Sequence, residues 1–359
     1  MRDLLKKLVS IPAVCGREQE IILYLWEKLH SLADEAYVDG LGNLVICMKG
    51  SRPGPTLHLS AHSDEVGFII KKVEPSGLLR FEKVGGNDDR NLLISRVIVK
   101  TDKGLLPGVI GTQSAHMRPY DKGDHIRASK EMYIDIGAKD AQSALVMGVE
   151  PGCTATWYSD YLEFGDGRVM GHAFDDRAGC AVLVKVLEET DFKRVAGEVY
   201  FVFSVQEELG IRGSKTASAQ IAADVAIAVD ATVVSDTPEA ALDNNLALGK
   251  GPAIKVMDGR TMSSSAVVSR LCQVAQQQQI PYQLEIFPGI GTDAGEMQFS
   301  GSGVPTGAVS IPSRYSHSCN EVIDLQDLEN SKELLIGFIY SMEAPSEFRF
   351  ANCLKGPRL

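Results

Sequence analysis

The two ends of the chain alternate between segments with helical and strand-like spacing of apolar residues. Apolar residues recur at helical spacing between 21 and 29, which predicts a helix over 17–34 after a shorter one over 2–10. Apolar runs at 44–47 and 56–61 flank a loop rich in Gly and Pro and predict two strands. The amino-terminal part of the chain therefore reads as α/β.

From about residue 66 the pattern changes to short runs of strand-forming residues between clusters of Gly, Asn, Asp and Pro. These runs lie at 67–73, 78–84, 96–101, 109–111, 132–136 and 154–158, and no long helical pattern interrupts them. The pattern predicts a small all-β unit. Its polar stretch at 114–130 predicts a mobile loop.

After residue 169 the alternation of helix and strand resumes. Predicted helices lie at 175–190, 214–221, 263–279 and 325–343, and predicted strands at 198–205, 225–229, 283–287 and 306–311. The simplest architecture is one α/β domain formed by residues 1–71 and 167–359. A β-rich domain would be inserted at 72–166.

Composition and charge narrow the class of protein. A length of 359 residues with 44% hydrophobic and 23% charged residues is typical of a soluble globular protein. The net charge of −11 disfavours binding to nucleic acid or to an anionic membrane surface. There is no secretory signal pattern and no apolar run of about 20 residues, the length that spans a bilayer. Seven scattered cysteines without a CxxC pair fit reduced thiols, so we expect a cytoplasmic protein.

Two adjacent carboxylates, Asp175 and Asp176, begin a long apolar helix pattern. By themselves they have an ordinary explanation, because acids cap the positive end of a helix. Other polar residues, however, follow each predicted core strand: His62 and Asp64, Glu207 and Glu208, Asp230, and His317. Open α/β sheets carry their sites at the carboxyl ends of the strands, so we expect these side chains to meet.

Each of these residues also has a structural alternative. A single His is often a core residue, Asp230 can cap the next segment, and Glu207 with Glu208 can be a solvated pair. Taken together, two His and three carboxylates exceed the three protein ligands that one catalytic Zn²⁺ needs. They suit two divalent ions that share one carboxylate, at a separation of about 3.5–4 Å. Nitrogen and oxygen ligands favour Zn²⁺, Co²⁺ or Mn²⁺.

Six segments together resemble the cytosolic dinuclear-metal aminopeptidases. They are SAHSDEVG at 60–67, GHAFDDRAG at 171–179, VQEELGIRGS at 205–214, VDAT at 229–232, GTDAG at 291–295 and RYSHS at 314–318. That family includes glutamyl and deblocking aminopeptidases, some once labelled endoglucanases, and its members typically form tetrahedral dodecamers. The resemblance covers essentially the whole chain, without a departure at any metal position. It implies a mixed-sheet α/β/α metallopeptidase domain with an inserted β-barrel that serves assembly.

The resemblance also implies a role for each site residue. Asp175 would bridge two metals, His62 and Asp230 would complete one site, and Glu208 and His317 the other. Asp64 would hold His62 in one tautomer, which is a catalytic support role, and Glu207 would be the general base. Asp176 would shape the turn beside an unusual peptide bond that family members have at this position. A metal-bridged water would be the nucleophile.

Three functions remain open from the residues alone. The first is an aminopeptidase that removes N-terminal residues from short peptides within a homo-oligomer, a dodecamer by resemblance. The second is a related metallo-deacylase or carboxypeptidase, and the third is a metal-stabilised scaffold without catalysis. The Gly-rich loop 288–295 is expected either to line the substrate pocket or to be a plain loop. Arg260 and Arg314 could supply charge to that pocket or be structural.

Overall fold

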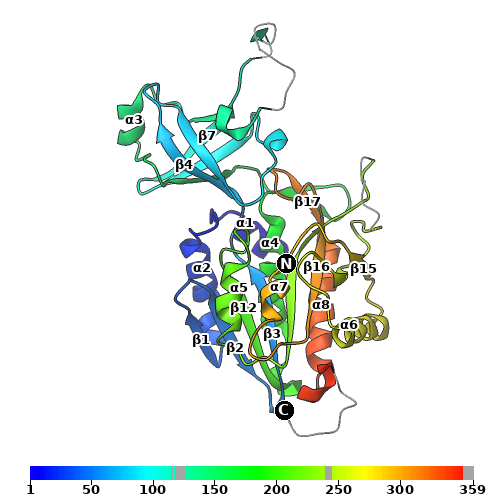
Figure 1. The fold of residues 1–359 in the computed structure, drawn as a ribbon. Helices are drawn as coiled ribbons and strands as arrows, with labels where there is room; N and C mark the ends of the chain where they lie inside the picture. Colours follow the sequence, from blue (N-terminus) through cyan, green and yellow to red (C-terminus); the bar gives the residue numbers. More distant parts are fainter. Residues whose placement is uncertain (115, 118–126, 239–244, 351–359) are drawn as a thin grey trace.

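A mixed β-sheet of eleven strands forms the centre of the larger part of the molecule, and a closed barrel lies at one end of it (Figure 1). The computed structural model describes residues 1–114, 116–117, 127–238 and 245–350. The main path of the sheet runs β1 (Glu35–Val38), β2 (Leu44–Lys49), β12 (Ala196–Ser204), β3 (Arg52–His62), β13 (Val225–Val233), β16 (Thr306–Arg314), β17 (Glu321–Asp324), β11 (Arg168–Gly171) and β10 (Leu162–Phe164). β14 (Ala253–Met257) pairs with β16 and with β15 (Gln283–Ile286).

The central strands β12, β3, β13 and β16 are parallel neighbours. Parallel strands have their carboxyl ends at the same edge of a sheet, and the predicted site residues lie at or after these strand ends. β13 pairs with β16 along almost its whole length, from Ala226 to Val233. This pairing extends β13 beyond the predicted end at 229, so Asp230 lies within the strand rather than after it.

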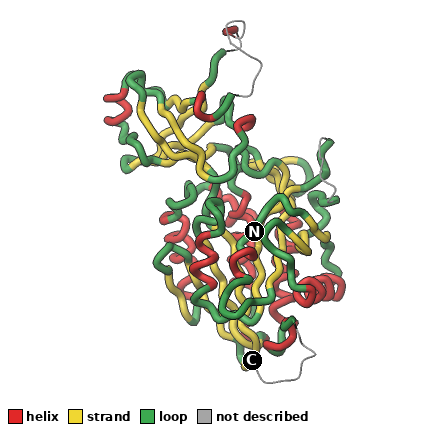
Figure 2. Tube along the Cα trace, viewed as in Figure 1, coloured by secondary structure: helices red, strands yellow, loops and turns green. Residues whose placement is uncertain are grey.

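Helices cover both faces of the sheet (Figure 2). They are α1 (Arg2–Val9), α2 (Gln19–Leu29), α4 (Phe174–Glu189), α5 (Arg212–Ser218), α6 (Ser265–Gln278), α7 (Ala294–Met297) and α8 (Leu325–Ser341). Successive residues of β13 face opposite sides of the sheet. Val225 and Ile227 therefore pack in the main core with α1, α4 and α8, whereas Ala226 packs on the other side with α7. Among the described residues, no helix has the length and apolarity needed to cross a membrane.

The barrel is antiparallel, with strand order β4 (Gly67–Val73), β5 (Leu79–Val84), β8 (Tyr133–Asp135), β7 (Gly104–Gly111), β6 (Arg96–Thr101) and β9 (Thr154–Trp157). Phe68 anchors its separate core, with ring contacts to Phe81 at 5.1 Å and to Trp157 at 5.5 Å. A short helix, α3 (Ala141–Val146), packs outside the strands. The α/β class with an inserted barrel is thus confirmed.

The exact division of the chain into domains stays a prediction. Barrel strands run from Gly67 to Trp157, and β10 and β11 already belong to the large sheet. Most of the predicted loop 114–130, including His125, lies outside the described residues. Five short strands (β1, β10, β11, β14 and β17) and the short helices α3 and α7 were not predicted. Contacts with neighbouring elements stabilise such short elements more than any pattern of their own.

Candidate metal centre

All five predicted metal ligands line one cavity of about 500 Å³ at the carboxyl edge of the parallel strands. They come from separate elements: His62 ends β3, Asp230 lies in β13 and Asp175 begins α4. Glu208 follows β12, and His317 follows β16 after two further residues. Only the parallel arrangement of the sheet brings these positions together.

Asp175 lies between the two histidines. Its Oδ1 is 3.2 Å from His62 Nε2, and its Oδ2 is 3.3 Å from His317 Nε2. Each histidine faces a second carboxylate, at 3.7 Å for Asp230 Oδ1 and 3.0 Å for Glu208 Oε1. The five residues therefore form two groups of three that share Asp175, and in each group the potential ligand atoms lie within 4.8 Å of one another.

The chemistry of these groups fits two divalent cations. Burial raises the pKa of Asp230 to about 7, although His62 opposes the shift. Burial also raises the pKa of Glu208, although His317, whose Nε2 lies 3.0 Å from Glu208 Oε1, opposes the shift. Like charges held together out of water need a cation or protons between them. The site offers imidazole and carboxylate ligands without a thiolate, as Zn²⁺, Co²⁺ and Mn²⁺ accept.

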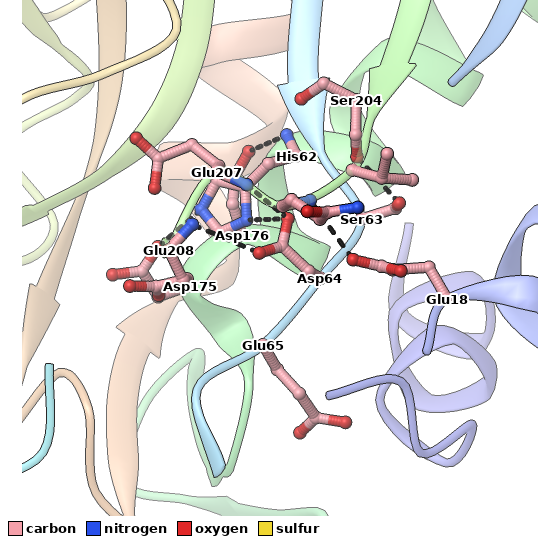
Figure 3. A network of polar contacts seen from close by, with 12 residues as sticks. Glu18, His62, Ser63, Asp64, Glu65, Asp175, Asp176, Ser204, Glu207 and Glu208 are labelled. Atoms are coloured by element: carbon pink, nitrogen blue, oxygen red, sulfur yellow. Dashed lines mark hydrogen bonds and ion pairs between the residues drawn. The ribbon is translucent and has the colours of Figure 1, made fainter. Parts of the chain in front are cut away.

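Asp64 connects His62 to the turn that carries the two glutamates (Figure 3). Its Oδ1 lies 3.4 Å from His62 Nδ1, the ring nitrogen that faces away from Asp175. The same carboxylate accepts hydrogen bonds from the backbone N–H groups of Glu207 at 3.0 Å and Glu208 at 3.1 Å. Asp64 thus lies beside the imidazole and holds the glutamate turn, which is the position expected of a support residue.

Glu207 lines the cavity but belongs to neither group of three. Figure 3 shows that its side chain and that of Glu208 extend in different directions from consecutive positions. Burial raises the pKa of Glu207 well above its usual value, and the carboxylates of Asp230 and Glu208 add to the shift while His62 opposes it. A carboxylate with a raised pKa accepts protons more readily than an ordinary glutamate.

Glu321 is a site residue that the sequence reasoning missed. Its buried carboxylate accepts hydrogen bonds from His317 N at 2.9 Å and from Asp175 N at 3.1 Å. It therefore holds the backbone of the shared residue and of the histidine in the second group of three. Glu321 lies in β17, a four-residue strand outside the quoted motifs, so no sequence signal marked it.

The backbone around the site adopts uncommon conformations. Ala173, Gln206 and His317 have φ values of 56°, 56° and 60°, in the left-handed region that non-glycine residues seldom occupy. The peptide bond between Asp175 and Asp176 is cis, which is the unusual bond that the resemblance implied. Asp176 itself points inward and accepts hydrogen bonds from His62 N at 3.2 Å and Gly179 N at 3.0 Å.

The remaining predicted positions separate into cavity and structural residues. Gly289, Ile290 and Gly291 line the cavity, so the Gly-rich loop does form part of its wall. Arg260 also lines it. Arg314 instead forms an ion pair with Asp236, with Nε 2.7 Å from Oδ1, and is structural.

Comparison with known proteins identifies the family. Residues 42–334 match the family model described as M42 glutamyl aminopeptidase. The chain belongs to this family. This M42 aminopeptidase is 37% identical to an aminopeptidase of the archaeon Desulfurococcus kamchatkensis, whose solved structure matches with a TM-score of 0.92 over 99% of this chain and 97% of the other.

Two further relatives belong to Pyrococcus species. The lysyl aminopeptidase of Pyrococcus furiosus is 31% identical over 96% of this chain and 98% of its own. The TET1 peptidase of Pyrococcus horikoshii, which can assemble into a tetrahedron or a large octahedral shell, is 31% identical with a TM-score of 0.86 over 94% of this chain and 99% of its own. The family resemblance and the class of enzyme, an aminopeptidase that hydrolyses peptide bonds, are confirmed.

Proposed function

We propose that this M42 aminopeptidase removes N-terminal residues from short peptides with two divalent metal ions held in the cavity. The observation that carries the proposal is the position of Asp175, whose two carboxylate oxygens face His62 and His317 separately at 3.2 Å and 3.3 Å. A carboxylate in this position can bridge two cations.

His62, Asp175 and Asp230 would hold one ion, and Asp175, Glu208 and His317 the other. Zn²⁺ and Co²⁺ fit the donor set, and Mn²⁺ is possible on the same grounds. The ions would supply Lewis acidity, which activates a water nucleophile and polarises the scissile carbonyl. Asp64 keeps His62 in the tautomer that presents Nε2 to the cavity.

Glu207 is the general base of the proposed reaction. It accepts a proton from the attacking water and returns it to the departing amine. Its place in the cavity, its raised pKa and the hydrogen bond from its own N–H to Asp64 support this role. The carboxylates around it also attract the substrate's free α-ammonium group, which limits cleavage to the first peptide bond.

A matched pair of variants tests the assignment. Glu207→Gln keeps the five ligands, so we expect normal metal content and a loss of turnover of about 10²–10⁴-fold, the usual contribution of general acid–base catalysis. Glu208→Gln removes a ligand, so we expect loss of metal as well as turnover. Metal content is measured by elemental analysis and activity with an aminoacyl-anilide panel, with N-acylated and C-terminal substrates as controls. Near-normal turnover by Glu207→Gln would refute the role of Glu207.

We also propose that the chain forms a homo-oligomer, in the form of a dodecamer. The support is its similarity to the TET1 peptidase of Pyrococcus horikoshii, which can assemble into a tetrahedron. An enclosed assembly would admit short peptides and exclude folded proteins. Light scattering tests this directly, and a monomer or isolated dimer at micromolar concentration would count against it.

A further inference from the structure

Four consecutive backbone N–H groups follow the end of β12, and each donates to a buried side chain from the amino-terminal part of the chain. The pairs are Val205 N with Asn43 Oδ1 at 3.0 Å, Gln206 N with Glu18 Oε1 at 3.1 Å, Glu207 N with Asp64 Oδ1 at 3.0 Å, and Glu208 N with Asp64 Oδ2 at 3.1 Å. An N–H group that lacks an acceptor inside a protein is costly, so this turn depends on all three side chains. Of the three, only Asp64 has a place in the proposed chemistry.

Glu18 is a fixed acceptor and not a mobile surface group. It precedes α2, and only 5% of it is exposed. Its Oε1 also accepts a hydrogen bond from Gly16 N at 2.6 Å. Cys15 N donates to Glu65 O at 3.1 Å, which ties this segment to the chain just after Asp64. Figure 3 shows the Glu18 side chain extending from the amino-terminal segment toward the polar network.

Glu18 and Asp64 together hold the backbone on both sides of Gln206, the residue before the proposed base. Gln206 has a φ of 56°, in the left-handed region that non-glycine residues seldom occupy. Glu18 accepts from the N–H group that precedes this residue's Cα, and Asp64 accepts from the next one, that of Glu207. Without Glu18, the first of these peptide groups can rotate and Gln206 can relax toward a negative φ. That change would move the Cα atom of Glu207.

The position of the Glu207 carboxylate depends on this backbone. Among the described residues, its oxygens have neither a hydrogen-bond donor nor an ion-pair partner. Glu208 differs, because its Oε1 faces His317 Nε2 at 3.0 Å and its carboxylate is a proposed metal ligand. A shift of the turn should therefore displace the base more than the ligand.

We propose that Glu18 is a positioning residue for the general base, an inference that rests on the proposed function. Glu18 does not line the cavity, so it acts through the backbone of Gln206 and not by contact with the substrate. Its loss should lower kcat and leave KM and metal content near the wild-type values. A displacement of about 1 Å at a reacting group costs about 100-fold in rate.

Three variants of Glu18 separate the reach of the side chain from its charge. Glu18→Ala removes the acceptor, so we expect kcat on an aminoacyl-anilide to fall by about 100-fold. Glu18→Gln keeps the length and one acceptor oxygen and should retain most of the wild-type kcat. Glu18→Asp keeps the charge but is one methylene shorter, so it should lose more kcat than Glu18→Gln. If Glu18→Ala does not fold, the comparison of the other two variants decides, and a larger loss in Glu18→Gln would overturn the proposal.

A double variant tests whether the effect passes through the base. In the Glu207→Gln background there is no base to position, so adding Glu18→Ala should leave the remaining kcat nearly unchanged. Two independent effects would instead multiply. A full additional loss in the double variant would therefore show that Glu18 does not act through Glu207.

Asp327→Ala is the matched control. Asp327 is also a buried carboxylate that accepts two backbone N–H groups, those of Gly249 and Gly251, both at 2.7 Å, and it does not line the cavity. Asp327→Ala should lose stability in urea, as Glu18→Ala should, but keep the wild-type kcat. Wild-type kcat in Glu18→Ala, or an equal loss of kcat in Asp327→Ala, would overturn the proposal while wild type stays active. If metal-loaded wild type cleaves no aminoacyl-anilide, the proposed function fails and this inference with it.

Discussion

Replacing each of two adjacent aspartates with asparagine should have different consequences. Asp175 presents one oxygen to His62 and the other to His317, at 3.2 Å and 3.3 Å, and so serves both groups of ligands. Asp176 is fully buried, and its partners among the described residues are two backbone N–H groups, those of His62 and Gly179. The substitutions are chemically identical and one position apart, so each controls for the other.

The expected magnitudes follow from these contacts. Asp175→Asn removes the negative charge that both ions would share and turns one ligand oxygen into an amide that cannot bind metal. Loss of a mere supporting partner weakens metal binding by about 10–100-fold, so loss of the shared ligand should exceed about 100-fold. Asp176→Asn keeps one acceptor oxygen and leaves one buried N–H unpaired, which costs about 1–3 kcal/mol of folding free energy.

Metal content and stability are measured on both variants. After dialysis in buffer with limiting Zn²⁺ or Co²⁺, Asp175→Asn should lose both metals, whereas Asp176→Asn should bind nearly as much as wild type. Urea unfolding of the metal-free proteins should show the larger loss of stability in Asp176→Asn. Equal metal loss in the two variants would refute the assignment of Asp175 as the shared ligand.

Three further predictions concern the site and its surroundings. Glu321→Ala leaves the N–H groups of Asp175 and His317 without their acceptor, so urea unfolding should show a loss of about 1–3 kcal/mol of folding free energy for each group. Glu321→Gln keeps one acceptor oxygen and should lose about half as much. Wild-type stability in Glu321→Ala would contradict this role of Glu321. Dialysis against a chelator should abolish activity and lower the free energy of unfolding. The expected loss is about 2.7 kcal/mol per site, compared with protein in the presence of free metal at 100 times its Kd. Activity should return when Zn²⁺, Co²⁺ or Mn²⁺ is added. Burial lowers the pKa of His58 to about 3, from an ordinary value near 6.5 in the unfolded chain. The folded state therefore holds His58 neutral at pH values where the unfolded chain binds a proton. This contribution to the free energy of unfolding is complete above about pH 6.5 and is lost as the pH falls. Wild type should therefore lose about 1 kcal/mol more than His58→Leu between about pH 7 and about pH 5.5, and equal losses by urea unfolding would contradict this origin.

Much of the centre could be predicted because the relevant signals are local. Strand patterns end just before His62 and Glu207, and residue type alone marks imidazoles and carboxylates as metal ligands. The rule that parallel strands share a carboxyl edge then brings these positions together without any coordinates. The structure places all five predicted ligands in one cavity on this basis.

Other features depend on contacts between segments far apart in the chain. Glu321 belongs to the site only because β17 pairs with β11 and β16, which aims its carboxylate at Asp175 and His317. Arg260 faces the same cavity only because Gly291 and Gly295 leave space beside its stem. No pattern within either segment specifies these neighbours.

The sequence by itself therefore determined the α/β class, the inserted β-rich unit and the identity of the candidate ligands, because each depends on periodicity or residue type along a short stretch. Tertiary structure alone decided that the two oxygens of Asp175 face different histidines, that Asp176 turns inward and that Glu321 accepts hydrogen bonds from the backbones of Asp175 and His317. These outcomes depend on distances of a few ångströms between separate elements. Such distances are set by the packing of the whole domain and not by any one segment.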